Sequence, residues 1–276
     1  MNILIVDGNE KEASDRYVNL GMATQYEVYS NILKKLANNN LNISIIHPAV
    51  LDNYIPKGLS IDDFDGVAWT GSLLNIYDAT PSIIRQIEFA KKLFEKNIKI
   101  FGSCWGLHVL VTAAGGKVRK NPKGLEAVIA KNIKLNEEGI AHPMYFGKNK
   151  TFDSFCWHYD EAEILPENTT ILASNYKSKV QAISFKKNKS IIWAVQYHPE
   201  FDPAWMSGLM HQREKILLEQ GIYKNEIEFN SYKHFFSDIK NQKVKKDHLN
   251  ITENLINEAM HTKELLNWLN FIKNEN

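Results

Sequence analysis

A cysteine lies between two glycines in the stretch Gly102-Ser103-Cys104-Trp105-Gly106. The apolar run before it reads as a strand and the run after it as a helix, so the stretch has the form of a cysteine nucleophile elbow. Small residues are needed there because a sharp strand-to-helix turn crowds the backbone and strains its central residue. Unpaired N–H groups at the helix N-terminus should stabilise a thiolate and lower its pKa. These features predict that Cys104 is a nucleophile rather than a small buried turn residue.

A nucleophilic thiol needs a base, and the stretch His198-Pro199-Glu200 follows a second apolar strand. Residues two apart share a face of an extended chain, so the imidazole and the carboxylate can project to the same side. The imidazole would take the thiol proton while the carboxylate orients the ring. Pro199 suits the end of a strand because it cannot donate to a ladder. The pattern predicts a triad in the chain order Cys104, His198, Glu200.

The joint presence of G-x-C-x-G and H-P-E resembles the class I (triad-type) glutamine amidotransferase family, as in the amidotransferase domain of GMP synthase-like proteins. The resemblance covers about residues 2–201. It implies that Cys104 attacks the side-chain amide of glutamine, which gives a γ-glutamyl thioester and ammonia, and that water then releases glutamate. In this reaction His198 would move protons and Glu200 would hold His198 in place.

A short loop before the elbow fits the same resemblance. Residues 70–75, Thr-Gly-Ser-Leu-Leu-Asn, occupy the place of the family's glycine-rich loop after the third strand. The resemblance implies an oxyanion hole made by the backbone N–H of Ser72, next to Gly71, and that of Trp105. Backbone donors leave the side chains at these positions free to vary.

The residues implied to touch the substrate depart from the family at two positions. Residues 157–161 resemble its H-G-D segment, which implies contacts around His158, Tyr159 and Asp160, with Tyr159 replacing the small residue; a loop-orienting role for His158 stays open. Four residues after the nucleophile, family members commonly carry glutamine, and this chain has His108 on the same helix face. Because an imidazole cannot fully mimic a carboxamide, the preferred γ-glutamyl substrate stays open.

Strand-like and helix-like runs alternate through the first 116 residues. Strands are expected at residues 2–6, 41–49, 64–72 and 98–103, with helices around residues 29–36, from Pro81 onward and at 105–116. Such βα repeats predict a doubly wound, flavodoxin-like α/β fold, with helices on both faces of a mostly parallel sheet. From Val118 to about Tyr197 shorter strand-like segments predict an antiparallel extension, and residues 190–198 read as a buried strand.

The chain beyond Pro203 reads as helical almost to its end. We expect residues 1–202 to form the amidotransferase-like domain and residues 203–276 to form a helical extension packed on it. The basic run at 243–246 is expected to be a solvated connector. One last amphipathic helix is predicted from the apolar spacing of Leu255, Ala259, Thr262, Leu266 and Leu269.

The composition of the chain excludes several classes of binding partner. A net charge of +1 gives no field that would attract nucleic acid or an acidic membrane surface. No window is long enough to span a bilayer and the N-terminus lacks the pattern of a signal peptide, so a cytoplasmic protein is expected. No phosphate-binding glycine loop or metal-ligand spacing occurs, so neither a cofactor nor a metal is expected. Cys156 and the tryptophans Trp69, Trp193 and Trp205 are expected in the core.

Three functions stay open at this level. The first is a glutaminase that delivers ammonia to a synthase on a separate chain, since no second catalytic domain follows the triad. The second is a stand-alone γ-glutamyl hydrolase acting on γ-glutamyl amines or peptides, which His108 supports. The third is a non-catalytic regulatory module, against which Cys104, His198 and Glu200 argue together. The expected partners are therefore glutamine or another γ-glutamyl compound and, for the first function, a synthase subunit.

Overall fold

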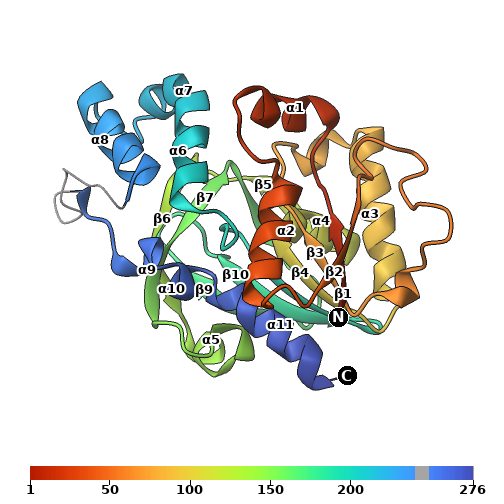
Figure 1. Cartoon of the computed structure of the whole chain (residues 1–276). Coiled ribbons are helices and arrows are strands. Elements are labelled where there is room, and N and C mark those ends of the chain that lie inside the picture. The colour runs from red at the N-terminus through yellow and green to blue at the C-terminus, as the bar shows by residue number, and fades with distance from the viewer. Residues whose placement is uncertain (240–248, 276) are drawn as a thin grey trace.

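The computed structural model describes residues 1–239 and 249–275 of the chain. Within them one mixed sheet of nine strands runs through the centre of the molecule (Figure 1). Neighbouring strands are parallel from β2 to β11 and antiparallel from β11 to β7, so the predicted α/β fold with an antiparallel extension is confirmed. In spatial order the strands are β2 (Asn42–Ile46), β1 (Asn2–Val6), β3 (Gly66–Trp69), β4 (Lys99–Ser103), β11 (Ser190–Val195), β10 (Ala182–Lys187), β9 (Thr170–Ser174), β6 (Glu126–Leu135) and β7 (Thr151–His158).

The central strands are buried almost throughout, which explains why their sequences are nearly continuous apolar runs. β11 covers only the first part of the strand predicted at 190–198, because it ends at Val195. Residues 196–200 therefore leave the sheet at the carboxyl edge of the parallel strands, where ligands bind in folds of this kind. A separate antiparallel pair is formed by β5 (Lys117–Lys120) and β8 (Asp160–Ile164).

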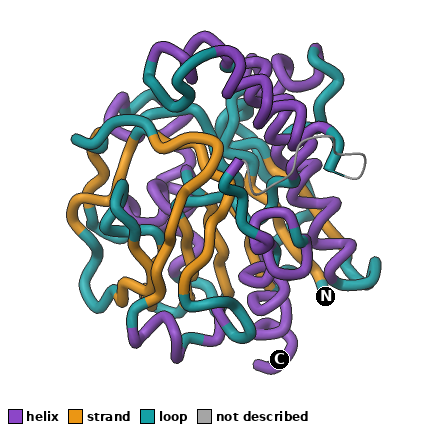
Figure 2. The backbone as a smooth tube through the Cα atoms, turned by 90° about the vertical axis from the view of Figure 1, so that its left-hand side faces the viewer, coloured by secondary structure: helices purple, strands orange, loops and turns teal. Residues whose placement is uncertain are grey.

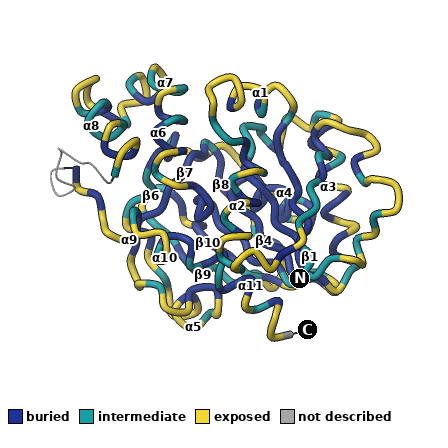
Figure 3. The backbone as a smooth tube through the Cα atoms, viewed as in Figure 1, coloured by how far each residue is buried: buried dark blue, intermediate teal, exposed yellow. Residues whose placement is uncertain are grey.

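Helices cover both faces of the parallel part of the sheet. Its apolar side chains form one cluster with α3 and α4 and another with α2 and α11. Thr24 and Glu27 form a capping box that fixes the start of α2. Figure 3 shows the strands buried and the outer sides of these helices exposed. The four helices are α2 (Gln25–Leu36), α3 (Pro81–Phe94), α4 (Trp105–Ala113) and α11 (Lys263–Glu275).

A third apolar cluster lies at one end of the molecule, where further helices pack over side chains of β6 and β7 such as Phe155 and Trp157. Figure 2 shows helices gathered at the top of the molecule, above the strands. The Nε1 of Trp205 donates to the carbonyl of Ala23 at 2.8 Å, which ties this group to the loop before α2. The group contains α1 (Lys11–Asn19), α6 (Pro203–Gln212), α7 (Glu214–Glu219) and α8 (Glu226–Ser237).

The end of the chain does not form the single helix that its apolar spacing predicts. Two short helices, α9 (Glu253–Ile256) and α10 (Glu258–His261), precede α11. Asn257 is extended at the end of α9, and its side chain caps α10 by accepting from the N–H of Met260. This break leaves Ala259 exposed, so the prediction of one continuous helix is wrong, although Leu255, Thr262 and Leu269 are buried as predicted. The buried face of α11 is formed by Leu265, Trp268, Leu269 and Ile272.

A short helix, α5 (Glu137–Ala141), follows β6 in the chain. Among the helices that the structure describes, none is long and apolar enough to cross a membrane. The basic run 243–246, predicted to be a connector, lies outside the described residues.

Candidate active site

The ends of two neighbouring parallel strands bring the predicted nucleophile and base to the same edge of the sheet. β4 and β11 pair in parallel with Ser103 opposite Val195. Cys104 follows β4 directly, and its N–H donates to the carbonyl of Val195 at 2.7 Å. His198 lies three residues after Val195, the last residue of the neighbouring strand β11. The parallel register therefore places the thiol-bearing and imidazole-bearing segments side by side.

Cys104 occupies a strained turn between β4 and α4. Its φ of 50° and ψ of −99° lie in a region that residues with side chains rarely adopt. The two flanking glycines are needed for close packing, since a Cβ on Gly102 would lie 2.8 Å from the carbonyl carbon of Gly106. A Cβ on Gly106 would lie 2.9 Å from the Cβ of Trp69. The backbone at Cys104 thus has the conformation of an elbow, and the glycines occur for the steric reason predicted.

A buried carboxylate orients the imidazole of His198. Nδ1 of His198 lies 2.6 Å from Oε1 of Glu200, and both side chains are almost fully buried. Because a carboxylate accepts, Nδ1 carries a hydrogen, and Nε2 is the ring nitrogen that remains for proton transfer. The second oxygen of Glu200 accepts from the hydroxyl of Ser103 at 2.9 Å, and Ser103 also contacts the hydroxyl of Tyr29. The Ser103 hydroxyl, inside the elbow motif, therefore holds the orienting carboxylate.

Aromatic stacking fixes the plane of the same imidazole. The ring of His198 stacks on Phe201 with centroids 3.9 Å apart and an angle of 7° between the planes. Phe201 in turn stacks on Trp205 of α6, also at 3.9 Å. The backbone N–H of His198 donates to the carbonyl of Phe155 at 2.8 Å. Since the ring is held on one edge by Glu200 and on one face by Phe201, little freedom remains for it to rotate.

The environment of the thiol differs from the sequence-based expectation. Cys104 is 3% exposed, and its Sγ donates to the carbonyl of Trp157 at 3.5 Å. Burial raises the pKa of Cys104, and the charges of Glu200 and Asp160 raise it further. The N–H of Trp105 lowers the pKa, as the helix N-terminus was expected to do, but this effect is smaller. The predicted lowering of the Cys104 pKa is therefore wrong, and the resting thiol is neutral.

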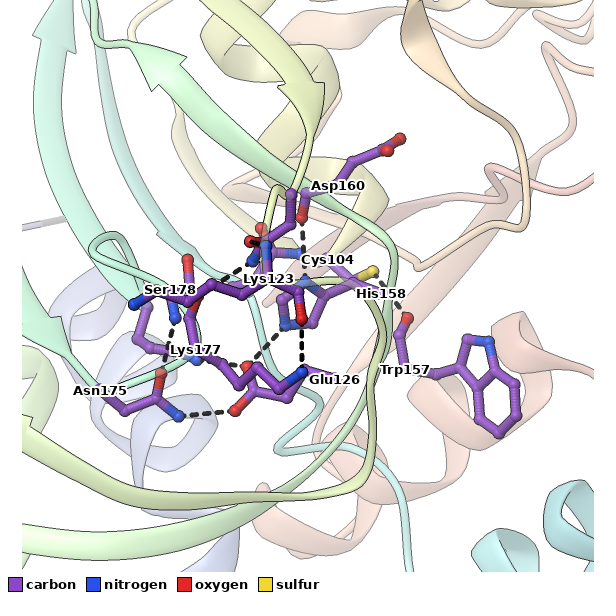
Figure 4. A network of polar contacts seen from close by, with 12 residues as sticks. Cys104, Lys123, Glu126, Trp157, His158, Asp160, Asn175, Lys177 and Ser178 are labelled. Atoms are coloured by element: carbon purple, nitrogen blue, oxygen red, sulfur yellow. Dashed lines mark hydrogen bonds and ion pairs between the residues drawn. The ribbon is translucent and has the colours of Figure 1, made fainter. Parts of the chain in front are cut away.

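No hydrogen bond joins the thiol to the imidazole within residues 1–239 and 249–275. The sulfur is instead directed to the Trp157 carbonyl, as the dashed line in Figure 4 shows. Catalytic hydrogen bonds in unliganded enzymes are often long or poorly aligned and tighten when substrate binds. Proton transfer from a neutral thiol to a base can then accompany attack on a carbonyl.

The loop predicted to supply an oxyanion donor is anchored through one carbonyl. The oxygen of Gly71 accepts from Nδ2 of Asn9 and from the hydroxyl of Thr70, each at 3.0 Å. In a trans peptide the C=O and the following N–H point in opposite directions. The N–H of Ser72 is therefore turned away from these anchors, and Ser72 lines a cavity beside the thiol. The arrangement is suited to an N–H that donates into this cavity.

The cavity beside the thiol has a volume of about 140 Å³. All four residues that the sequence implicated in substrate contact line it together with Cys104. His198 and Glu200 are buried outside this lining. The structure thus brings the predicted contact residues to one cavity, while the predicted base and carboxylate lie in the adjoining interior. The four contact residues are His108, His158, Tyr159 and Asp160.

His108 is held by a glutamine that the sequence analysis did not single out. Nε2 of His108 lies 2.9 Å from Oε1 of Gln196, which is fully buried two residues before His198. Burial lowers the pKa of His108 to about 4, so the ring is neutral near pH 7 and donates from Nε2. The amide nitrogen of Gln196 has no partner in the described part of the chain, and it lowers the pKa of Cys104. Gln196 therefore presents a donor toward the thiol.

A buried ion pair fixes His158 beneath the cavity, and Figure 4 shows its network. Nδ1 of His158 lies 2.9 Å from the carbonyl of Asp160, and Nε2 lies 2.9 Å from Oε2 of Glu126. Both partners are acceptors, so the ring donates from both nitrogens and carries a positive charge. Glu126 also accepts from Asn175 and Gln181. Both nitrogens of His158 are therefore occupied by groups of the protein, which favours the loop-orienting role over direct contact with the substrate.

Asp160 and Tyr159 form another side of the cavity. Oδ1 of Asp160 accepts from the hydroxyl of Tyr77 at 3.1 Å. Burial raises the pKa of Asp160, and burial together with that carboxylate raises the pKa of Tyr77 to about 12. Tyr159 is half-buried, and its backbone carbonyl accepts from the N–H of Asn121 at 2.8 Å. The larger side chain at position 159 therefore occupies part of the cavity wall.

Several residues of the site carry no local sequence signal. Asn9, Glu126 and Gln181 reach it from distant segments, and Arg213 lines the cavity from the end of α6. Gln196 and Ser103 could have been noticed, since Gln196 lies in the strand predicted at 190–198 and Ser103 lies inside the G-x-C-x-G motif. Among the described residues, no group of three or more His, Cys, Asp or Glu side chains could hold a metal ion.

The sequence is similar to a protein family model and to several known enzymes. The family model "Glutamine amidotransferase class-I" matches residues 24–214. The γ-glutamyl-L-1-hydroxyisopropylamide hydrolase of a Pseudomonas species is 34% identical over 230 residues, which are 81% of this chain and 76% of that protein. γ-Glutamyl peptidase 4 of Arabidopsis thaliana is 30% identical over 155 residues, 55% of this chain and 60% of the peptidase. Two GMP synthases match 49% and 39% of the chain.

A solved structure supports the architecture over the whole chain. A glutamine amidotransferase from Thermotoga maritima superposes with a TM-score of 0.68 and covers 99% of this chain and 97% of its own. The two sequences are 14% identical, so this likeness concerns the fold. The fold includes the mixed sheet and the C-terminal helices.

Proposed function

The chain belongs to the class I glutamine amidotransferase family, and from that membership we propose that it is a stand-alone hydrolase of γ-glutamyl amides. The observation that carries the proposal is the match to a γ-glutamyl amide hydrolase over 81% of the chain. The sequence alone favoured a glutaminase serving a separate synthase. The named relatives favour the hydrolase instead, and His108 at the cavity agrees with a substrate other than glutamine.

In the first half of the proposed reaction, Cys104 forms the acyl-enzyme. Its sulfur attacks the γ-carbonyl carbon of the substrate while Nε2 of His198 takes the thiol proton. The negative charge on the carbonyl oxygen is stabilised by the N–H groups of Ser72 and Trp105. The C–N bond then breaks, and the amine leaves with the proton that His198 returns. The products of this half are a γ-glutamyl thioester and a free amine.

In the second half, water replaces the amine. Nε2 of His198 accepts a proton from water, whose oxygen attacks the thioester carbonyl. Breakage of the C–S bond returns the proton to the sulfur and releases glutamate, so the neutral thiol is restored. Glu200 stabilises the imidazolium that forms in each half, because it accepts from Nδ1 at 2.6 Å. Burial raises the pKa of Cys104, which makes proton removal coincide with attack rather than precede it.

The test is turnover by the purified chain with no partner added. We expect hydrolysis of γ-L-glutamyl isopropylamide with a kcat/KM above that for L-glutamine, measured by release of glutamate. Cys104→Ala should lower kcat by at least about 10³-fold, since it removes the nucleophile. The matched control is Cys156→Ala, because Cys156 is also fully buried but lies in β7.

Three results would count against this function. Turnover of glutamine only when a synthase is added would restore the glutaminase. Equal turnover by Cys104→Ala would remove the thiol from the reaction. Absence of turnover, with a physiological role that survives Cys104→Ala, would favour the regulatory module.

A further inference from the structure

Arg213 places a guanidinium in the wall of the cavity that contains the candidate nucleophile. It follows the last residue of α6, and its N–H closes that helix by donating to the carbonyls of Leu209 and Met210 at 3.1 Å each. Its side chain lines the cavity together with Cys104 and Asp160. The guanidinium therefore reaches the site from the segment after the H-P-E motif.

This guanidinium has no protein partner in the part of the chain that the structure describes. Its Nε is buried and makes no hydrogen bond there, and no carboxylate lies within ion-pair distance. Burial raises the pKa values of Tyr17 and Tyr159, and the positive charge of Arg213 opposes this rise at both residues. A buried donor without a partner costs free energy, and the cost is larger for a charged group. An anion bound in the cavity would remove this cost.

The same cavity carries one negative group. Asp160 uses Oδ1 to accept from Tyr77, and among the described residues no hydrogen bond reaches its second carboxylate oxygen, which can therefore accept from a ligand. The lining of this cavity of about 140 Å³ therefore includes Arg213, Asp160 and the nucleophile candidate Cys104, together with His158, whose two ring nitrogens are already hydrogen-bonded. The α-carbon of a γ-glutamyl group carries a carboxylate and an ammonium, so its charges complement Arg213 and Asp160.

We propose that Arg213 binds the α-carboxylate of the γ-glutamyl group, and that it thereby restricts the enzyme to substrates with that carboxylate free. The proposal rests on the proposed function, since it names the part of the substrate that is recognised. Guanidinium groups bind carboxylates through two parallel hydrogen bonds, which gives direction as well as affinity. The leaving amine carries no obligatory charge, so the paired charges of the cavity fit the glutamyl end better.

The experiment compares two substrates that differ only at the α-carbon: γ-L-glutamyl isopropylamide and the same compound with an α-carboxamide. The wild-type chain should prefer the free carboxylate by about 10²-fold in kcat/KM, because the buried Nε of the half-buried Arg213 is left without an acceptor when the carboxylate is absent. Arg213→Gln should lower kcat/KM for the first substrate by about 10²-fold and leave the second within about threefold. Arg213→Lys should recover part of the preference, since it restores the charge without the planar fork.

The matched control is Lys215→Gln, which removes a positive charge two residues away. Lys215 is exposed and pairs only weakly with Glu219 at 3.7 Å, so the preference should not change. Thermal melting of each variant checks that it is folded. The proposal is overturned if Arg213→Gln keeps the wild-type preference, or if its losses follow a carboxylate on the leaving group, tested with γ-glutamylglycine against γ-glutamyl methylamide.

A binding measurement separates this proposal from the proposed function. If the wild-type chain hydrolyses neither substrate, the function fails while the site can still be tested. Calorimetric titration of L-glutamate into Cys104→Ala should then show binding that is weakened about tenfold or more by adding Arg213→Gln. Equal affinity in both variants would overturn the role of Arg213.

Discussion

The imidazole of His198 packs directly against the backbone of Gly71. A Cβ on Gly71 would lie 2.5 Å from Cε1 of His198 and 3.4 Å from its Nε2. The first distance is shorter than a carbon–carbon contact allows, and the ring cannot retreat because it stacks on Phe201 at 3.9 Å. The candidate base and the loop of the candidate oxyanion donor are thus fitted to each other at one glycine.

Gly71→Ala should therefore impair turnover much more than folding. We expect kcat to fall by about 10²-fold, because the base shifts by a few tenths of an ångström or more from its working position. The control is Gly115→Ala, where φ is 98° and a Cβ would meet nothing within 4 Å. That change should cost roughly 1 kcal/mol of stability through backbone strain and leave kcat unchanged. Wild-type kcat in Gly71→Ala would show that the ring position does not limit turnover.

Asn9 should act as a positioning residue for the same loop. Its Nδ2 donates to the carbonyl of Gly71, so Asn9→Asp replaces a donor by an acceptor and repels that carbonyl. We expect kcat to fall by about 10-fold to 10²-fold with little change in KM, because the N–H of Ser72 acts most strongly on the transition state. The measurement is steady-state hydrolysis of γ-L-glutamyl isopropylamide.

A matched amide elsewhere separates positioning from folding. Asn267 of α11 donates in the same way to the carbonyls of Met144 and Phe146, each at 2.9 Å, far from the cavity. Asn267→Asp should lower the melting temperature but not kcat. If both variants lose activity in proportion to stability, Asn9 has no specific role in catalysis.

The local motifs predicted much of this site because their geometry is set by short spacing. G-x-C-x-G defines a turn that crowds its own backbone, and H-P-E places an imidazole and a carboxylate two residues apart. The pairing of β4 with β11 then follows from the parallel fold. Three residues of the site could not be predicted. Asn9 contacts Gly71 from 62 residues away, and Glu126 contacts His158 from 32 residues away. Arg213 reaches the cavity from the end of a helix that contains no motif.

Two expectations were wrong for identifiable physical reasons. The helix N-terminus does lower the pKa of Cys104, but burial has the larger effect, and burial is a property of the whole fold. The apolar stripe near the C-terminus was interpreted as one helix, whereas Asn257 caps a new helix by accepting from the N–H of Met260. Spacing alone cannot reveal such a break, because a cap inside a periodic pattern leaves the periodicity intact.

Glu200→Gln should make the thiol more acidic while it slows catalysis. The charge of Glu200 is the second cause, after burial, that raises the pKa of Cys104. Removing it should increase the rate of alkylation by iodoacetamide at pH 8 severalfold, because a larger fraction of the sulfur is then thiolate. Turnover should fall by about 10²-fold or more, since the imidazolium loses its partner. Mass spectrometry of Cys104 and steady-state kinetics give the two measurements.

The pH dependence of Cys104 alkylation in the wild-type chain tests the same effect of the Glu200 charge on the thiol. Because the pKa of Cys104 lies above its ordinary value of 9.0, the alkylation rate should still be rising above pH 9. The control is Glu161→Gln, which removes a carboxylate that pairs with Arg119 and should leave alkylation unchanged. Slower alkylation in Glu200→Gln than in the wild type would show that the carboxylate activates the resting thiol instead.

Glu126 should stabilise the fold in a pH-dependent way. Burial pulls its pKa upward, but the donors His158, Asn175 and Gln181 outweigh burial and hold the pKa below 4.5. The unfolded chain therefore takes up this proton near pH 4.5, whereas the folded chain takes it up only at lower pH. Stability from Glu126 is present above pH 4.5 and is lost as the pH falls through the folded value.

Glu126→Gln removes that charge while it keeps the shape of the side chain. At pH 7 we expect the free energy of unfolding to fall by about 2 kcal/mol, the size of a hydrogen bond to a charged group. The difference from wild type should shrink as the pH drops below 4.5, because the wild-type carboxylate is then protonated as well. Urea denaturation at pH 7, 5 and 3.5 gives the comparison, and Glu163→Gln at an exposed pair should leave the midpoint unchanged. A deficit that stays constant across this range would mean that packing, and not the charge on Glu126, holds His158 in place.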